Sequence, residues 1–168
     1  MPLQIGAPDV AFPRLNMFGY WVFVSGGLFL YSSFVLGGAP DGGWFGYAPL
    51  TSTPLARGFL PGRGPDFWAM GLILLGVGSI TAAVNFIVTI VQLRAKGMSW
   101  MRLPFFVWAQ LVTAFLLLLA FPPLEAAGVM QLMDNLFGTS FFLPSGLVVS
   151  GQTLNVSGGG SPLLWQHL

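Results

Sequence analysis

The stretch WAMGLILLGVGSITAAVNFIVTIV, Trp68 to Val91, decides the fold of this chain. It contains no charged residue, and it exceeds the roughly 20 apolar residues that a helix needs to cross the hydrocarbon core of a bilayer. Runs of this length are the signature of a membrane environment and not of a water-soluble core. We therefore predict a membrane-spanning helix over residues 67–91.

Two further stretches have the same character. Residues 16–36 contain YWVFVSGGLFLYSSFVL, and residues 104–121 read PFFVWAQLVTAFLLLLAF. Each is close to the length of a membrane-spanning helix. The predicted fold class is therefore all-α integral membrane, with three transmembrane helices and the start of a fourth at about residue 161.

Pro122 and Pro123 directly follow the third predicted helix. Proline removes a backbone donor, but helices in membranes tolerate it with a local bend. We expect a kinked extension of this helix to about Met133. A polar loop with a glycine run, from Asp134 to Gly160, is expected to follow it.

The composition limits the classes of function. Of the 168 residues, 55% are hydrophobic and 7% are charged, and the mean hydropathy is +0.79. The net charge is only +1, so the sequence offers no basic patch for nucleic acid. Cysteine is absent and the single histidine is His167, so the chain by itself cannot complete a disulfide or a thiolate or histidine metal site.

Small residues in the first two predicted helices indicate close helix packing. Small side chains let helix backbones approach one another inside a membrane. We therefore predict that these residues face protein and not lipid. In the first helix they are Gly19, Ser25, Gly26 and Gly27, and in the second Gly71, Gly76, Gly78, Ser79, Ala82 and Ala83.

The distribution of positive charge predicts an orientation, because Lys and Arg accumulate in short cytoplasmic loops. Arg57 and Arg63 lie between the first two predicted helices, on one side of the membrane. The other side carries four basic residues: Arg14, Arg94, Lys96 and Arg102. This bias predicts a cytoplasmic N-terminal end, with Asp9 as the one acid on that side.

Polar side chains at membrane depth are the candidate functional residues, because a buried carboxamide or hydroxyl costs free energy unless a partner or water satisfies it. Asn16 opens the first predicted helix, and Asn85 lies inside the second, with Ser79 six residues earlier. An intramembrane Asn or Ser more often holds helices together than forms an ion path. The residue types alone therefore leave both interpretations open.

The segment GAPDVAFPRLN, Gly6 to Asn16, is similar to the segment that follows the second transmembrane helix in subunit I of the heme-copper terminal oxidases, the cytochrome c oxidase family. Later strings keep the order of that family, and the resemblance covers essentially the whole chain. These strings are WFGYAPL (44–50), SITAAVNFIVTI (79–90), MSWMRLPFFVWA (98–109), GTSFF (138–142) and GGGSPLLWQHL (158–168).

The resemblance implies that residues 1–168 are a partial cytochrome oxidase subunit I domain. They would be an internal piece of a twelve-helix bundle, spanning its third, fourth and fifth helices and the start of the sixth. The complete subunit is expected to hold two hemes and a copper ion, with metal ligands before and after this piece and none within it. His167 belongs to the QHL string and is not implied to be a ligand. The isolated piece is therefore expected to be inactive.

The resemblance also implies part of a proton path, the D channel of this family. Asp9 matches the acid at its cytoplasmic mouth, and Asn16 matches an asparagine near that mouth. Asn85 matches a further lining asparagine, and Ser79 one of two adjacent serines farther along. An ionisable mouth collects protons, and amides and hydroxyls hold a file of water across an otherwise apolar bundle.

Several positions depart from the family. Gly78 replaces the second serine of the pair, Gly19 replaces a serine expected soon after Asn16, and Met17 replaces an asparagine. We expect water to substitute for the missing hydroxyls. On the outer side, Leu143 and Ser161 stand where the family has acidic residues. An insertion through LVVSGQTLNV (147–156) lengthens the outer loop.

The expected function is that of subunit I of a proton-pumping respiratory oxidase, which passes electrons from cytochrome c to oxygen. The implied partners are subunits II and III, the remaining helices of subunit I, cytochrome c and the lipid bilayer, and the implied location is a bacterial-type inner membrane. One alternative is a quinol oxidase of the same family, because the electron donor is selected largely outside this stretch. The others are a membrane scaffold protein, or a transporter fragment that binds a substrate through Asn16 and Asn85. Neither of these explains the ordered strings.

Overall fold

The computed structural model describes residues 1–36, 38–40, 42–48, 50–52, 64–149, 151–153 and 158–168. Arg57 and Arg63, on which part of the predicted orientation rests, lie outside these ranges, as does Asp41. The described elements, in chain order, are α1 (Pro2–Ile5), α2 (Pro13–Leu36), α3 (Gly64–Gln92), the 3₁₀ turn η2 (Trp100–Arg102), α4 (Phe105–Phe137), β1 (Val148–Val149), β2 (Gln152–Thr153) and α5 (Leu163–His167).

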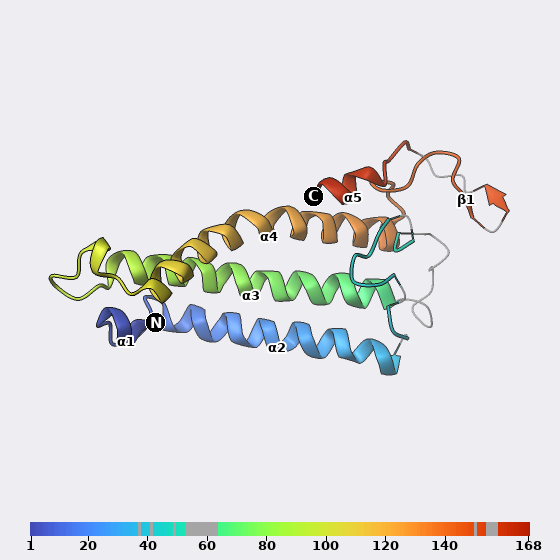
Figure 1. Ribbon diagram of the computed structural model, residues 1–168. Coiled ribbons are helices and arrows are strands. Elements are labelled where there is room, and N and C mark those ends of the chain that lie inside the picture. The colour runs from blue at the N-terminus through green and yellow to red at the C-terminus, as the bar shows by residue number, and fades with distance from the viewer. Residues whose placement is uncertain (37, 41, 49, 53–63, 150, 154–157) are drawn as a thin grey trace. The chain divides into compact units, whose positions relative to one another are not determined.

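Three of these helices, α2, α3 and α4, are long and apolar enough to cross a membrane (Figure 1). The all-α membrane fold class predicted from the sequence is therefore confirmed. In the most apolar windows of α2 and α4, 17% of the residues are buried within this chain, and in that of α3 33%. Most of the apolar surface of α2 and α4 is thus available to lipid or to other protein.

The helices begin earlier than the hydrophobic pattern indicates. α2 begins at Pro13, and α3 begins at Gly64 with Pro65 next. Proline suits the first turn of a helix, where its missing N–H has no intrahelical partner in any case. Asp66 follows in the first turn of α3, where a carboxylate interacts favourably with the helix dipole.

The far end of α4 also differs from the expectation. The helix continues past Pro122 and Pro123 to Phe137, beyond the expected end near Met133. Asp134 is therefore helical and does not begin the loop. The segment that follows contains a two-stranded antiparallel ribbon, in which Val148 pairs with Thr153. That ribbon lies in the insertion predicted to lengthen the outer loop.

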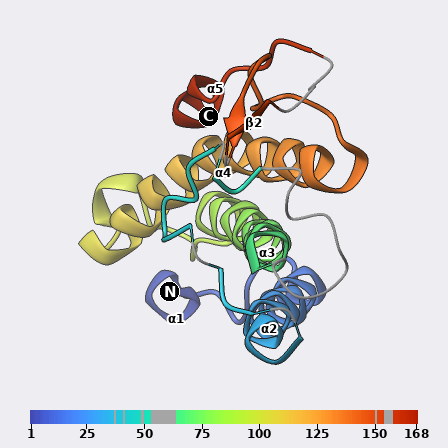
Figure 2. The same ribbon diagram turned by 90° about the vertical axis from the view of Figure 1, so that its right-hand side faces the viewer.

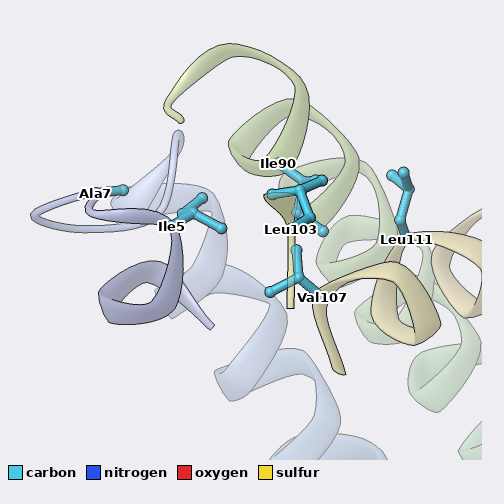
Figure 3. Packing of buried hydrophobic residues seen from close by; sticks show 6 residues of the cluster. All are labelled: Ile5, Ala7, Ile90, Leu103, Val107 and Leu111. Atoms are coloured by element: carbon cyan, nitrogen blue, oxygen red, sulfur yellow. The ribbon is translucent and has the colours of Figure 1, made fainter. Parts of the chain in front are cut away.

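The chain divides into two compact units, each of which contains parts of α2, α3 and α4. The first unit consists of residues 1–25 and 74–122, and the second of residues 26–73 and 123–168. The first unit has a buried apolar cluster in which Ile5, from α1, points toward side chains of α3 and α4 (Figure 3). The members of this cluster are Ile5, Ala7, Ile90, Leu103, Val107 and Leu111.

Two contacts attach the polar connections of the first unit to its core. The backbone N–H of Ala95 donates to the carbonyl of Ile5 at 2.9 Å, which holds α1 beside the connection after α3. The Arg94 guanidinium lies 3.7 Å from the ring centroid of Trp100, in a cation–π contact. The basic connection after α3 is therefore ordered against the rest of the unit.

The second unit has its own apolar core around Trp68 of α3. Trp68 and Leu132 of α4 are buried there, and Leu30 of α2 and Trp165 of α5 pack against them. In this unit α3 lies between α2 and α4, with α5 on the α4 side (Figure 2). The Trp165 indole N–H donates to the carbonyl of Phe45 at 3.0 Å, which attaches α5 to the loop after α2.

Asp134 organises the segment that follows α4. Its side chain is 1% exposed and accepts from the backbone N–H groups of Phe141 and Phe142, both at 2.9 Å, and from the Thr139 hydroxyl at 2.6 Å. A carboxylate that accepts several hydrogen bonds compensates for its own burial. Leu143, where the family is expected to have an acid, is 1% exposed and therefore part of the packed interior.

Contacts within this chain support the predicted role of the small residues at some positions. Gly19 and Gly26 are buried, and a Cβ placed on Gly71 would lie 2.9 Å from Cβ of Leu30. Ser25, in contrast, is exposed, and no atom of the described residues lies within 4 Å of the place that a Cβ on Gly27 would occupy. Residues of this chain therefore do not cover Ser25 and Gly27, and that these two face protein stays a prediction.

Candidate functional site

Asn85, in the half of α3 that belongs to the first unit, holds the backbone of the segment before α2. Its side chain is fully buried. Its Oδ1 accepts from the Phe12 N–H at 3.0 Å, and its Nδ2 donates to the Phe12 carbonyl at 3.2 Å. A buried carboxamide requires such partners, because an unpaired one costs free energy. One side chain thereby satisfies both polar groups of the Phe12 backbone.

Thr89 lies one turn after Asn85 on the same face of α3 and extends this contact. Its hydroxyl accepts from the Ala11 N–H at 2.9 Å and donates to the Asn85 carbonyl at 2.6 Å. Each bond adds about 1 kcal/mol to stability, and leaving a buried partner unpaired costs more. The two residues together form what we call the Asn85–Thr89 clamp, which fixes residues 11 and 12.

Asp9 lies two residues before the clamped backbone. Its side chain is exposed, and its Oδ1 accepts from the Val10 N–H at 2.7 Å. Because Ala11 and Phe12 are fixed by the clamp, the position of this carboxylate is restricted even though water reaches it.

A hollow of about 290 Å³ lies between the first part of α2 and the second half of α3, within the first unit. Four polar side chains line it: Asn16, Tyr20, Ser79 and Thr81. The remaining lining residues are Gly19, Phe23, Gly78 and Ala82. Since water occupies about 30 Å³ in the liquid, the hollow has room for several molecules and offers them polar partners.

Two glycines on facing helices border this hollow. A Cβ placed on Gly78 would lie 3.0 Å from the carbonyl oxygen of Gly19. A Cβ placed on Gly19 would lie 2.6 Å from the Thr81 hydroxyl oxygen. The two helix segments therefore approach more closely than side chains at these positions would permit, as is usual for small residues in membrane helices.

The Ser79 and Thr81 hydroxyls are bonded as donors to their own helix. Ser79 donates to the Leu75 carbonyl at 3.0 Å, and Thr81 donates to the Gly78 carbonyl at 2.8 Å. A hydroxyl oxygen that donates once keeps two lone pairs as acceptors. Both side chains can therefore accept hydrogen bonds from water in the hollow.

The structure brings together two of the four residues singled out from the sequence. Asn16 and Ser79 line the same hollow. Asn85 is not among the lining residues, and its carboxamide is bonded to Phe12. Asp9 is likewise outside the hollow, in the segment that precedes the clamp.

Sequence reasoning missed three residues of this region: Tyr20, Thr81 and Thr89. The spacing of four residues between Asn85 and Thr89 was a usable signal, because such pairs share one face of a helix. The close approach of Thr81 to Gly19 cannot be predicted from the sequence, since it depends on the distance between two helices.

Metal ligands were expected outside this stretch. Within the described part of the chain, no three side chains of His, Cys, Asp or Glu come together in a group that would hold a metal ion. His167 is exposed in the last turn of α5. The residues described therefore do not fit as a complete ligand set for copper.

Comparison with known proteins identifies the family. The family described as "Cytochrome C and Quinol oxidase polypeptide I" matches residues 1–168, which is the whole chain. The chain belongs to this family. It is thus a member of the heme-copper oxidase subunit I family, as the ordered strings indicate.

Individual relatives agree with this assignment. Cytochrome c oxidase subunit 1 of Bacillus sp. (strain PS3) is 48% identical over 168 residues, and that of Bacillus subtilis (strain 168) is 45% identical; each match covers 100% of this chain and 24% of the relative. Quinol oxidase subunit 1 of Bacillus subtilis (strain 168) is 40% identical over 168 residues. This match covers 100% of this chain and 23% of the relative. The chain thus spans about a quarter of the length of the relatives that it matches.

The clamp gives a first prediction for the membrane-embedded protein. Asn85→Ala removes both bonds to Phe12, so the free energy of opening this segment should fall by about 2 kcal/mol. Amide exchange at Phe12 should then be roughly 30-fold faster, measured by hydrogen–deuterium exchange with mass spectrometry.

Ser79→Ala is the matched control, because it removes a polar group from the same helix that bonds only to a carbonyl of that helix. Exchange at Phe12 should not change in this control. Equal protection of Phe12 in Asn85→Ala and in the unaltered protein would contradict the clamp.

Proposed function

We propose that this chain acts as part of subunit I of a proton-pumping terminal oxidase, and that its first unit forms the cytoplasmic section of a D-type proton path. The observation that supports this most directly is the hollow, which is lined by both Asn16 and Ser79. These are two of the residues that the family resemblance associates with the path. The clamped segment that carries Asp9 precedes the same helix.

In this proposal, Asp9 takes up protons from the cytoplasmic water. Its exposed carboxylate binds a proton and releases it to water that leads toward the hollow. Asn16, Ser79 and their neighbours then hold water molecules by hydrogen bonds, and a proton passes along these molecules. None of these side chains other than Asp9 needs to change its own protonation state.

Asn85 has a positioning role in this proposal. Its carboxamide is occupied by the Phe12 backbone, so it acts on the path by fixing the segment that carries Asp9. Loss of the side chain would let that carboxylate move relative to the hollow. The asparagine associated with the path from the sequence would thus act through the backbone.

The charge distribution supports a cytoplasmic location for the first unit. Its only acid is Asp9, and its four basic residues are Arg14, Arg94, Lys96 and Arg102. By sequence, the second unit has two basic residues, Arg57 and Arg63, against the four of the first unit. Positive residues accumulate on the cytoplasmic side of bacterial membrane proteins, so we propose a bacterial-type inner membrane with the N-terminal end in the cytoplasm.

The complete enzyme would hold two hemes and a copper ion, which supply the electron transfer and the reduction of oxygen to water. Parts of subunit I outside this chain would provide the metal ligands. Subunits II and III would be the protein partners. This chain alone would be inactive, because it contributes the proton path and no metal site.

Cytochrome c is the proposed electron donor. The two relatives named above as cytochrome c oxidase subunits are 48% and 45% identical to this chain. The quinol oxidase subunit, at 40%, makes quinol the second candidate. Oxygen consumption by the purified complete enzyme should be supported by reduced cytochrome c and not by a quinol; the opposite preference would assign the chain to a quinol oxidase.

Substitution of Asp9 tests the proton path. In the complete oxidase reconstituted in vesicles, Asp9→Asn removes the proton-binding group at the mouth. Turnover should fall by about tenfold or more, and proton pumping should be lost, because positioned proton transfer contributes about 10²–10⁴-fold to rates. Oxygen uptake and external pH would be recorded together.

Asp9→Glu is the control, since it keeps a carboxyl group at the same position. It should retain most of the turnover and pumping. Unchanged turnover and pumping in Asp9→Asn would refute the proposed path.

A further inference from the structure

The hydroxyl of Thr81 occupies the space that a side chain at residue 19 would need. A Cβ on Gly19 would lie 2.6 Å from the Thr81 Oγ1 and 3.7 Å from its Cβ. Real Cβ atoms do not approach an oxygen so closely, so a side chain at residue 19 would require the Thr81 hydroxyl to leave its present position. The Thr81 hydroxyl can therefore occupy this position because residue 19 is a glycine.

The surroundings of Thr81 are suited to binding water. The side chain is half-buried and lines the hollow, together with Asn16, Tyr20 and Ser79. Its hydroxyl proton is directed to the Gly78 carbonyl at 2.8 Å, which leaves the oxygen as an acceptor. Gly78 presents no side chain that would fill the hollow from the same turn of α3.

We propose that Thr81 is a positioning residue of the proton path, and that it supplies from α3 the hydroxyl that residue 19 of α2 lacks. This inference rests on the proposed function and names a residue that neither the sequence reasoning nor the family resemblance singled out. Thr81 accepts a hydrogen bond from water in the hollow and orients it toward the next molecule. Protons move between water molecules, and the hydroxyl keeps its own proton.

The first experiment removes the hydroxyl. In the complete oxidase reconstituted in vesicles, Thr81→Val keeps the branched shape of the side chain but cannot bind water. The number of protons pumped per electron should fall by at least half, and turnover should fall by about five- to tenfold, the rate equivalent of one lost hydrogen bond. Thr81→Ser should retain both quantities.

Thr113→Val is the matched control, because Thr113 is an exposed threonine on α4 of the same unit and does not line the hollow. Its pumping and turnover should equal those of the unaltered enzyme. Heme absorbance per milligram of protein reports assembly for every variant, so a change in pumping is compared only between assembled enzymes.

A second experiment moves the hydroxyl from one helix to the other. Thr81→Ala opens the space next to residue 19, and adding Gly19→Ser returns a hydroxyl to the hollow from α2. The double variant should pump at least twice as many protons per electron as Thr81→Ala alone. Gly19→Ser in the presence of Thr81 should lower pumping, because the two side chains would collide.

Two outcomes would overturn the role of Thr81. One is a Thr81→Val enzyme that pumps as the unaltered enzyme does, and the other is a double variant no better than Thr81→Ala. If Asp9→Asn still abolishes pumping in the same preparation, the proposed path stands and only the role of Thr81 is lost. If Asp9→Asn also has no effect, the proposed function fails as well.

Discussion

The carboxamide of Asn85 is the group on which the arrangement of the first unit most depends. It is fully buried in a largely apolar helix, so it must find partners within the protein. It finds both of them on the backbone of Phe12. A helix that crosses the membrane thereby fixes a segment that lies outside the regular helices. The neighbouring residue Ala11 is also held, because its N–H donates to the Thr89 hydroxyl.

This constraint connects the exposed segment with the hollow. α2 begins at Pro13, directly after the clamped residues, so fixing Phe12 also fixes the start of that helix. Gly19, two turns into α2, then meets Gly78 and Thr81 of α3. The clamp provides attraction between the two helix segments, and the glycines permit their close approach. Polar side chains near this contact line a shared hollow, in which we propose that water is held.

The same sequence shows where prediction from residue types succeeds and where it stops. The three long helices were predictable because length and hydrophobicity alone determine whether a helix can cross a bilayer. Their ends were less predictable. Pro13 and Pro65 extend α2 and α3 at their starts, and the helical position of Asp134, bonded to the backbone of Phe141 and Phe142, has no hydrophobic signature.

The candidate site likewise contains residues that could be identified from the sequence and residues that could not. Asn16 and Ser79 were identified from their types and from the family strings, and both line the hollow. Thr81 was missed, because the role proposed for it depends on the absence of a side chain at Gly19 on another helix. The two interpretations of Asn85 were not separable from sequence: the carboxamide holds backbone in place, and the proposed contribution to the path follows from that contact. Ordered water in the hollow of the complete oxidase, in a cryo-electron microscopy map in lipid nanodiscs that resolves individual water molecules, is the most direct test of this account. The account predicts water within hydrogen-bonding distance of the Thr81 and Ser79 hydroxyls, beside an Asn85 carboxamide paired with Phe12. A hollow filled by an apolar side chain or a lipid tail would contradict it.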